Sequence, residues 1–100
     1  MKISESTIQR VWEHGRVIPG YDPDNWRRDD CGAWMQRDDY MNDQSEFGWR
    51  IVAICSGEPH HINDLKPFQH QNNFDHSSHE AYCLVTAVTD DLPQPPSPPY

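Results

Sequence analysis

A shortage of apolar residues is the strongest constraint on how this chain can fold. Hydrophobic residues make up 35% of its 100 residues, and the mean hydropathy is −0.93. Aromatic side chains compensate, because four Trp, four Tyr and three Phe each carry a large apolar area. The length suits one domain and no more. We therefore expect a single domain over residues 1–88, with a thin core built around aromatic rings.

The C-terminal segment, residues 89–100, has a different composition and contains five prolines. Proline has no backbone N–H to donate, so this segment cannot continue a sheet and is expected to be an extended, mobile tail. Two interpretations remain open. Proline-rich segments can dock into aromatic grooves of a partner, or the tail is a flexible end without a function of its own.

The N-terminal residues predict a short helix. Ser4 is a good N-cap residue, and the apolar residues Ile8, Val11 and Trp12 recur at helical spacing as a buried stripe. Gly15 is expected to stop the helix. No apolar run reaches the ~20 residues of a membrane helix, and the N-terminus lacks the apolar stretch of a signal peptide. We expect a soluble protein of the host cytoplasm.

Short apolar runs separated by turn residues predict a mixed α+β fold. Residues 31–35, 47–54 and 81–88 are expected to be strands, the last two from their apolar and β-branched composition. The polar stretch 37–46 suits a hairpin connection or a short helical turn. Residues 64–73 predict a second helix, with Pro67 near its first turn.

The cysteine pattern does not predict a disulfide framework. Cys31, Cys55 and Cys83 are odd in number and have no short spacing, so neither a disulfide set nor a zinc site built from closely spaced cysteine pairs is supported. We expect small hydrophobic side chains within strands.

The charge balance bears most directly on function. Eight Lys and Arg oppose sixteen Asp and Glu, a formal net charge of −8. Phosphate neutralisation supplies much of the affinity of DNA-binding domains, so direct binding to nucleic acid is not expected. An acidic surface favours basic partners, including proteins that themselves bind nucleic acid. Plain solubility is the alternative explanation.

Five segments, in order, resemble a family of small bacterial and phage HNH endonucleases. The resemblance spans about residues 10–76, and the matching segments are residues 12–23, 26–29, 31–35, 47–51 and 64–73. Each segment alone is a weak match, and the order makes the set fairly specific. The family implies a ββα unit holding one divalent metal, so the resemblance implies an HNH-like ββα core with the N-terminal helix and a C-terminal strand added to it.

The residues that perform HNH chemistry are largely replaced. Alignment places Val52 at the metal-binding Asp of the family, Ala53 at the general-base His, and Asp64 at the middle Asn, while Asn73 keeps the final Asn. A hard divalent cation needs oxygen ligands, and loss of a general base typically costs about 10²–10⁴ in rate. We therefore expect no enzymatic activity, no metal and no cofactor. Asp64 is more simply interpreted as a helix cap than as a catalytic gain.

A shifted site is the alternative. It would use Glu58, His60 and His61 as displaced groups, completed by some of Asn72, Asn73, His76 and His79. That alternative predicts a metal-dependent DNA endonuclease. A structural or adventitious zinc site is a further alternative, and solvated loop histidines are the plainest interpretation.

The small size, the acidity and the altered HNH motif together are similar to anti-CRISPR proteins. That resemblance implies a non-catalytic inhibitor of the type I-F Cascade surveillance complex, which blocks target DNA by occupying a basic DNA-binding surface. A structural phage or toxin-system protein remains an alternative. The partner-binding candidates are six acids and one aromatic residue: Asp29, Asp30, Asp38, Asp39, Tyr40, Asp43 and Glu46.

Overall fold

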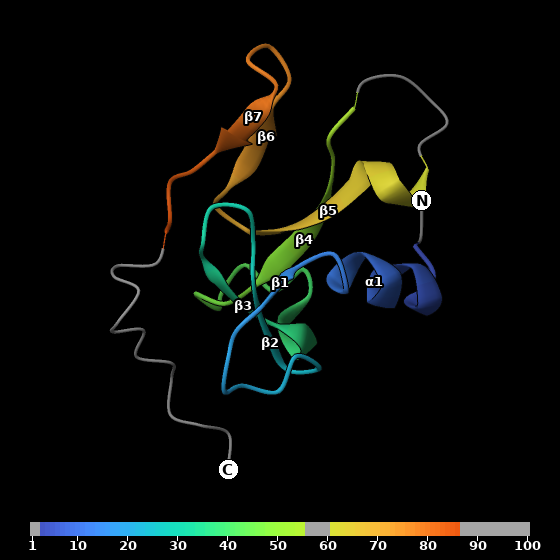
Figure 1. Cartoon of the computed structure of the whole chain (residues 1–100), viewed down its shortest axis with the longest axis vertical. Helices are drawn as coiled ribbons and strands as arrows, with labels where there is room; N and C mark the ends of the chain where they lie inside the picture. Colours follow the sequence, from blue (N-terminus) through green and yellow to red (C-terminus); the bar gives the residue numbers. More distant parts are fainter. Residues whose placement is uncertain (1–2, 56–60, 87–100) are drawn as a thin grey trace.

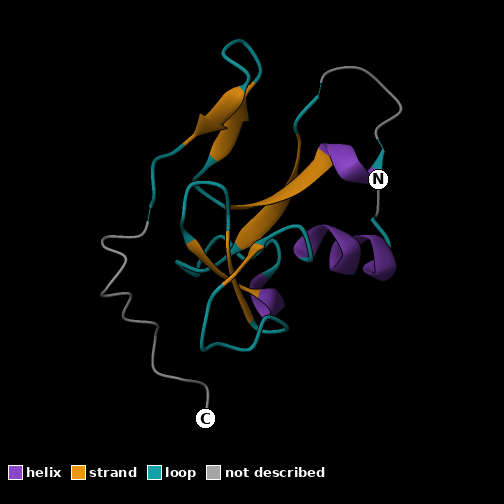
Figure 2. Cartoon of the chain, viewed as in Figure 1, coloured by secondary structure: helices purple, strands orange, loops and turns teal. Residues whose placement is uncertain are grey.

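A computed structural model describes residues 3–55 and 61–86. Its class is α+β, as predicted, with one α-helix, two short 3-10 turns and seven short strands among these residues (Figures 1 and 2). The elements in chain order are α1 (Glu5–Trp12), β1 (Arg16–Val17), β2 (Trp26–Arg28), β3 (Trp34–Gln36), η1 (Arg37–Asp39), β4 (Trp49–Ala53), η2 (Ile62–Asp64), β5 (Leu65–Gln69), β6 (Asn73–Asp75) and β7 (Glu80–Tyr82).

The strands form three small antiparallel sheets. Their orders are β1-β2-β3, β4-β5 and β6-β7. Helix α1 packs against β5. Figure 1 shows the β6-β7 hairpin extending away from the body formed by α1 and the other two sheets. The molecule therefore has two regions, which we call the body and the hairpin.

Helix α1 forms as the capping pattern predicts. The Ser4 hydroxyl accepts a hydrogen bond from the Thr7 N–H at 3.2 Å, which satisfies one of the free donors of the first turn. The apolar stripe Ile8, Val11 and Trp12 is buried. Among residues 3–55 and 61–86, no helix is long and apolar enough to cross a membrane.

Aromatic rings dominate the core, as the composition predicts. One cluster holds Trp12 and Trp49, both fully buried, with ring centroids 5.1 Å apart. A second cluster joins Trp26 and Trp34, with centroids 5.9 Å apart. Two of the buried indoles donate to backbone carbonyls: Trp12 to Pro23 at 2.9 Å and Trp49 to Arg37 at 3.2 Å.

The predicted helix over residues 64–73 is wrong. Residues Leu65–Gln69 form β5, which pairs with β4 from Trp49↔Gln69 to Ala53↔Leu65. Pro67 explains part of the error, because inside a helix it would remove a hydrogen bond and clash with the preceding turn. Pairing with the apolar strand β4 also buries Pro67, Phe68 and Gln69 together. The expected ββα core is not seen within residues 61–86, because no α-helix follows the antiparallel pair β4-β5 there.

Two strands lie close to their predicted positions. The run 31–35 corresponds to β3, which begins at Trp34, and the run 47–54 corresponds to β4, which begins at Trp49. The polar stretch 37–46 contains the short helical turn η1, one of its two predicted forms.

The strand predicted over residues 81–88 is shorter than expected. Only Ala81 and Tyr82 of that run belong to β7, and residues 87–88 lie outside the described ranges. The backbone N–H groups of Leu84 and Val85 both donate to the Asn72 side-chain oxygen at 2.8 Å. A side chain therefore satisfies the groups that a neighbouring strand would otherwise bond. The domain boundary at residue 88 and the predicted tail, residues 89–100, also lie outside the described residues.

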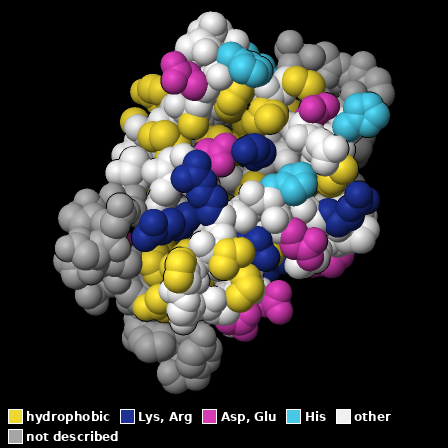
Figure 3. Space-filling view, in the orientation of Figure 1, with side chains coloured by type: hydrophobic (Ala, Val, Ile, Leu, Met, Phe, Trp, Pro, Cys, Tyr) yellow, Lys and Arg dark blue, Asp and Glu magenta, His cyan; other side chains and the backbone are white. Residues whose placement is uncertain are grey.

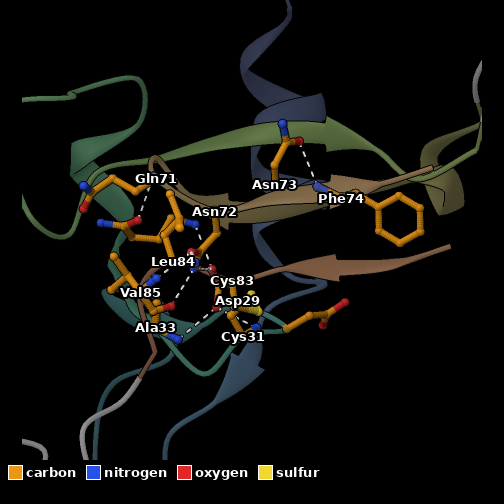
Figure 4. Close-up of a disulfide and its surroundings, with 12 residues drawn as sticks. Asp29, Cys31, Ala33, Gln71, Asn72, Asn73, Phe74, Cys83, Leu84 and Val85 are labelled. Carbon is orange, nitrogen blue, oxygen red and sulfur yellow. Dashed lines mark hydrogen bonds between the residues drawn. A yellow bond between two sulfur atoms is a disulfide. The ribbon is translucent and has the colours of Figure 1, made fainter. Parts of the chain in front are cut away.

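The expectation of unpaired cysteines is wrong for two of the three. Cys31 and Cys83 form a disulfide with a Cα–Cα distance of 5.6 Å, while Cys55 is free (Figure 4). The pair is separated by 52 residues, so no local spacing indicates it. The disulfide links the turn between β2 and β3 to the segment that follows β7.

Candidate functional site

Asp29 is a structural hub and not a partner-binding acid, which corrects the prediction. Its side chain is 1% exposed. One carboxylate oxygen accepts hydrogen bonds from the N–H groups of Cys31 and Ala33, and the other accepts from the Gln69 N–H and the Asn72 amide, all at 2.9 Å (Figure 4). Burial raises the pKa of Asp29, and these hydrogen bonds oppose that rise. Asp29 thus fastens the β2–β3 turn to the end of β5.

Asp30 is also engaged within the chain. Its carboxylate is 2.9 Å from the Lys66 ammonium and 3.9 Å from the Arg16 guanidinium. A partner would have to replace these contacts, so Asp30 is a poor candidate for a binding contact. The sequence groups Asp29 and Asp30 with the other acids, and tertiary pairing separates them.

The remaining acids lie on a single surface loop, residues 37–47, which we call the acidic loop. Its backbone is fixed to β4, since the Met41 N–H donates to the Trp49 carbonyl at 2.7 Å and the Trp49 indole donates to the Arg37 carbonyl at 3.2 Å. Gly48 closes the loop, because a Cβ at this position would clash with the Asn42 carbonyl oxygen. The acidic loop therefore presents its side chains from a held backbone.

Three acids of the loop are exposed to solvent: Asp38, Asp43 and Glu46. Asp39 is half-buried and accepts a 2.6 Å hydrogen bond from the Ser45 hydroxyl. Tyr40 is half-buried too, with its ring 4.8 Å from that of Trp49. Burial, together with the negative charge of Glu5, raises the pKa of the Tyr40 hydroxyl. Asp39 and Tyr40 therefore support the loop more than they offer free contacts.

Met41 is a surface residue that sequence reasoning missed. Its side chain is 66% exposed and its backbone has a φ of 63°. An apolar side chain held out among carboxylates on a positive-φ residue is unusual. The sequence signal that could have identified Met41 is the presence of a methionine within the polar run Asp-Asp-Tyr-Met-Asn-Asp.

The first two positions that the HNH resemblance aligns with catalytic residues, Val52 and Ala53, are consecutive on β4. Val52 is buried opposite Lys66, and Ala53 is half-buried opposite Leu65. Neither side chain has an atom that can bind a cation or carry a proton. The Ala53 backbone carbonyl accepts a hydrogen bond from the His76 ring at 3.0 Å.

The other two positions do not form a site with β4. Asp64 ends the turn η2 and accepts a hydrogen bond from the His61 N–H, a local capping contact. The prediction that Asp64 caps a helix over residues 64–73 is wrong, because residues 65–69 form β5; Asp64 is instead the last residue of η2, whose N-cap is His61. Asn73 is exposed on β6, and its side-chain oxygen accepts from the N–H of the next residue, Phe74, at 2.8 Å (Figure 4).

The groups of the alternative shifted site are dispersed. Glu58 and His60 lie outside the described residues. His61 is exposed beside η2, and Asn72 is buried against Asp29. In the β6-β7 hairpin, the ring centroids of His76 and His79 each lie 5.3 Å from that of Phe74. The two histidines therefore do not share a helix face. Across residues 3–55 and 61–86, no three His, Cys, Asp or Glu side chains are grouped closely enough to hold a metal ion.

The acidic loop is therefore the part of the predicted site that the structure keeps together. It brings Asp38, Asp43 and Glu46 to the surface with Met41 among them. Comparison with protein-family models, with curated proteins and with solved structures finds no match to this chain.

Proposed function

We propose that this chain is a non-catalytic inhibitory protein that binds the type I-F Cascade surveillance complex and blocks its binding of target DNA. The observation that carries the proposal is the acidic loop, which exposes three carboxylates and a methionine on a backbone hydrogen-bonded to β4. The proposed place of action is the host cytoplasm.

The chemistry of the loop suits a basic partner surface. Carboxylates can occupy positions where a DNA-binding groove otherwise holds phosphates, and charge complementarity accelerates association and selects the partner. Met41 supplies an apolar contact that can be desolvated at the centre of such an interface. The net charge of −8 acts in the same direction, since it repels DNA and attracts cationic protein surfaces.

The altered HNH positions support a binding role over catalysis. Val52 and Ala53 lie adjacent on β4, where the family resemblance places the metal ligand and the base. Restoring those functions would require different side chains at both positions.

The test is binding of the purified protein to purified type I-F Cascade at near-physiological salt, followed by DNA-binding competition. The Asp38→Lys/Asp43→Lys/Glu46→Lys variant is expected to weaken complex formation by about 100-fold, because each change places a cation against a basic surface. The matched control, Glu13→Lys/Asp24→Lys/Glu80→Lys, makes the same change in net charge at exposed acids elsewhere. It is expected to bind within about threefold of wild type.

Equal losses in the two triple variants would mean that bulk charge, and not the acidic loop, drives binding. Wild-type affinity in the loop variant would remove the loop from the interface. If the wild-type protein does not bind Cascade at all, the inhibitor proposal fails. DNA cleavage with Mg²⁺, Mn²⁺ and Zn²⁺ would then test the shifted nuclease site.

A further inference from the structure

The Cys31–Cys83 disulfide joins two segments that are held to very different degrees. Cys31 lies in the β2–β3 turn, where its backbone N–H donates to the buried Asp29 carboxylate at 2.9 Å. The same carboxylate oxygen accepts from the Ala33 N–H, also at 2.9 Å. These bonds fix the turn without help from the disulfide, so Cys31 stays part of the body whether or not the disulfide is present.

Cys83 lies in a region of weaker attachment. We call residues 73–86 the hairpin region, and each of them is exposed or half-buried. The Asn72 side chain accepts from the N–H groups of Leu84 and Val85 and donates to the Val85 carbonyl, all at 2.8 Å. The His76 ring adds a 3.0 Å hydrogen bond to the body. Each such bond contributes little, because water competes for both partners.

The hairpin region is already well solvated while it is attached. Figure 3 shows histidine and acidic side chains at the hairpin end of the molecule, where His76, His79 and Glu80 are exposed. Detaching this region therefore sacrifices little buried apolar area. Among the described residues, the disulfide is the strongest single link between the hairpin region and the body.

The two sulfur-bearing residues also differ in access to solvent. Cys83 is exposed, whereas Cys31 is half-buried (Figure 4). Thiol–disulfide exchange depends on which sulfur an incoming thiolate can reach. The exposure of Cys83 therefore makes its sulfur the point of attack.

We propose that this disulfide is a redox switch, which docks the hairpin region on the body when oxidised and releases it when reduced. Glutathione, the named reductant, attacks as its thiolate at the Cys83 sulfur. The Cys31–Cys83 bond breaks, a mixed disulfide forms on Cys83, and Cys31 leaves as a thiolate that takes up a proton. A second glutathione thiolate attacks the mixed disulfide and frees the Cys83 thiol. The products are two protein thiols and one oxidised glutathione, so two electrons have been transferred.

Release should open the hairpin region to proteases, because a protease needs a mobile, extended segment. Chymotrypsin, which cleaves after aromatic residues, has sites at Phe74 and Tyr82 within this region. In the body, the four Trp side chains are no more than 8% exposed. Reduction is therefore expected to speed cleavage within residues 73–86 and to leave the Trp sites of the body protected.

The experiment incubates the full-length protein with reduced or with oxidised glutathione, at a concentration on the order of 10 mM. Chymotrypsin is then added, and the fragments are followed by mass spectrometry. Cleavage after Phe74 and Tyr82 should be about tenfold faster in reduced glutathione, since it follows the population of the opened form. Cleavage after Trp12 and Trp49 should be the same in both buffers.

The attacked sulfur is identified in the Cys55→Ser variant, because the free Cys55 can form an adduct of its own. After a brief exposure to reduced glutathione, free thiols are blocked with iodoacetamide. We expect glutathione on Cys83 and the blocking group on Cys31. Glutathione found on Cys31 instead would overturn the assignment of Cys83 as the attacked residue.

Two variants complete the test. Replacing both Cys31 and Cys83 with Ser should give fast cleavage of the hairpin region in either buffer, whereas Cys55→Ser should respond to glutathione as wild type does. A disulfide that stays intact in reduced glutathione would overturn the switch, and so would equal cleavage rates in the two buffers. Fast cleavage after Trp49 on reduction would show that the body unfolds too, which also overturns it. The inference does not involve the acidic loop, so it stands or fails independently of the proposed function.

Discussion

The body and the β6-β7 hairpin are stabilised by different means. The body, formed by α1 and strands β1–β5, buries four Trp side chains, each no more than 8% exposed. In contrast, none of residues 73–86 is buried. The hairpin region is attached through the Cys31–Cys83 disulfide and through the hydrogen bonds of Asn72. The His76 ring adds a hydrogen bond to the Ala53 carbonyl of β4. A segment without a fully buried residue is thus attached mainly by one covalent bond and by polar contacts.

This contrast predicts that the body and the hairpin region unfold separately. Loss of a core side chain should unfold the whole chain, because the body supplies the hydrophobic stabilisation. Loss of the disulfide should release the hairpin region first.

Trp49→Ala should have the largest effect. The side chain is fully buried between Trp12 and Tyr40 and also anchors the acidic loop. The expected loss in free energy of unfolding is about 3–5 kcal/mol, measured by urea denaturation. Val17→Ala, at a residue 57% exposed, is the control and should change stability by less than about 0.5 kcal/mol. A small loss at Trp49 would contradict the assignment of the core.

Replacing both Cys31 and Cys83 with Ser should have the next largest effect. Removing the cross-link is expected to cost about 2–4 kcal/mol, through the greater freedom of the unfolded chain. Hydrogen exchange should quicken in residues 73–86 while α1 and β4 stay protected. Cys55→Ser changes the free cysteine and serves as the control. Uniform loss of protection across the chain would show that the two regions unfold as one unit.

The disulfide also bears on the proposed place of action. Cytosolic thiols keep most disulfides reduced, so a protein working there would have the hairpin region less firmly attached. The acidic loop belongs to the body, and its hydrogen bonds within the described residues do not involve Cys31 or Cys83. Cascade binding is therefore expected to survive reduction of the disulfide.

A pH titration should show the smallest effect, at the junction of the two regions. Burial raises the pKa of Asp29 above the ordinary value of 3.8. Its contribution to stability is therefore fully present below that value and is lost as pH rises through the folded pKa. The pKa of Asp75 is lowered by hydrogen bonds from Ser77, so its contribution is lost as pH falls below 3.8. Asp29 therefore changes the stability of the fold above pH 3.8, and Asp75 changes it below pH 3.8.

The measurement compares the free energy of unfolding of wild type and Asp29→Asn between pH 4 and pH 7. Asn does not titrate, so wild type should lose stability relative to the variant as pH rises. A constant offset between the proteins, from altered hydrogen bonding, would not affect this slope. Parallel pH profiles would show that Asp29 has no raised pKa.

The sequence alone determined the features that depend on local chemistry. The Ser4 cap and the stripe of Ile8, Val11 and Trp12 predict α1, because capping and helical periodicity act over a few residues. The apolar run 47–54 predicts β4, and the aromatic count predicts a core of rings. The acidic loop was predicted as a polar connection bearing Asp38, Asp43 and Glu46, and these side chains are exposed.

Only the tertiary structure decided the features that join distant residues. Residues 65–69 became a strand because β4 offered a partner, and Cys31 met Cys83 because the fold brings them to a Cα–Cα distance of 5.6 Å. Asp29 and Asp38 are chemically alike in sequence, yet one is a buried hub and the other is exposed. Pairing, burial and charge neutralisation depend on which residues meet in space, and local sequence does not specify those meetings.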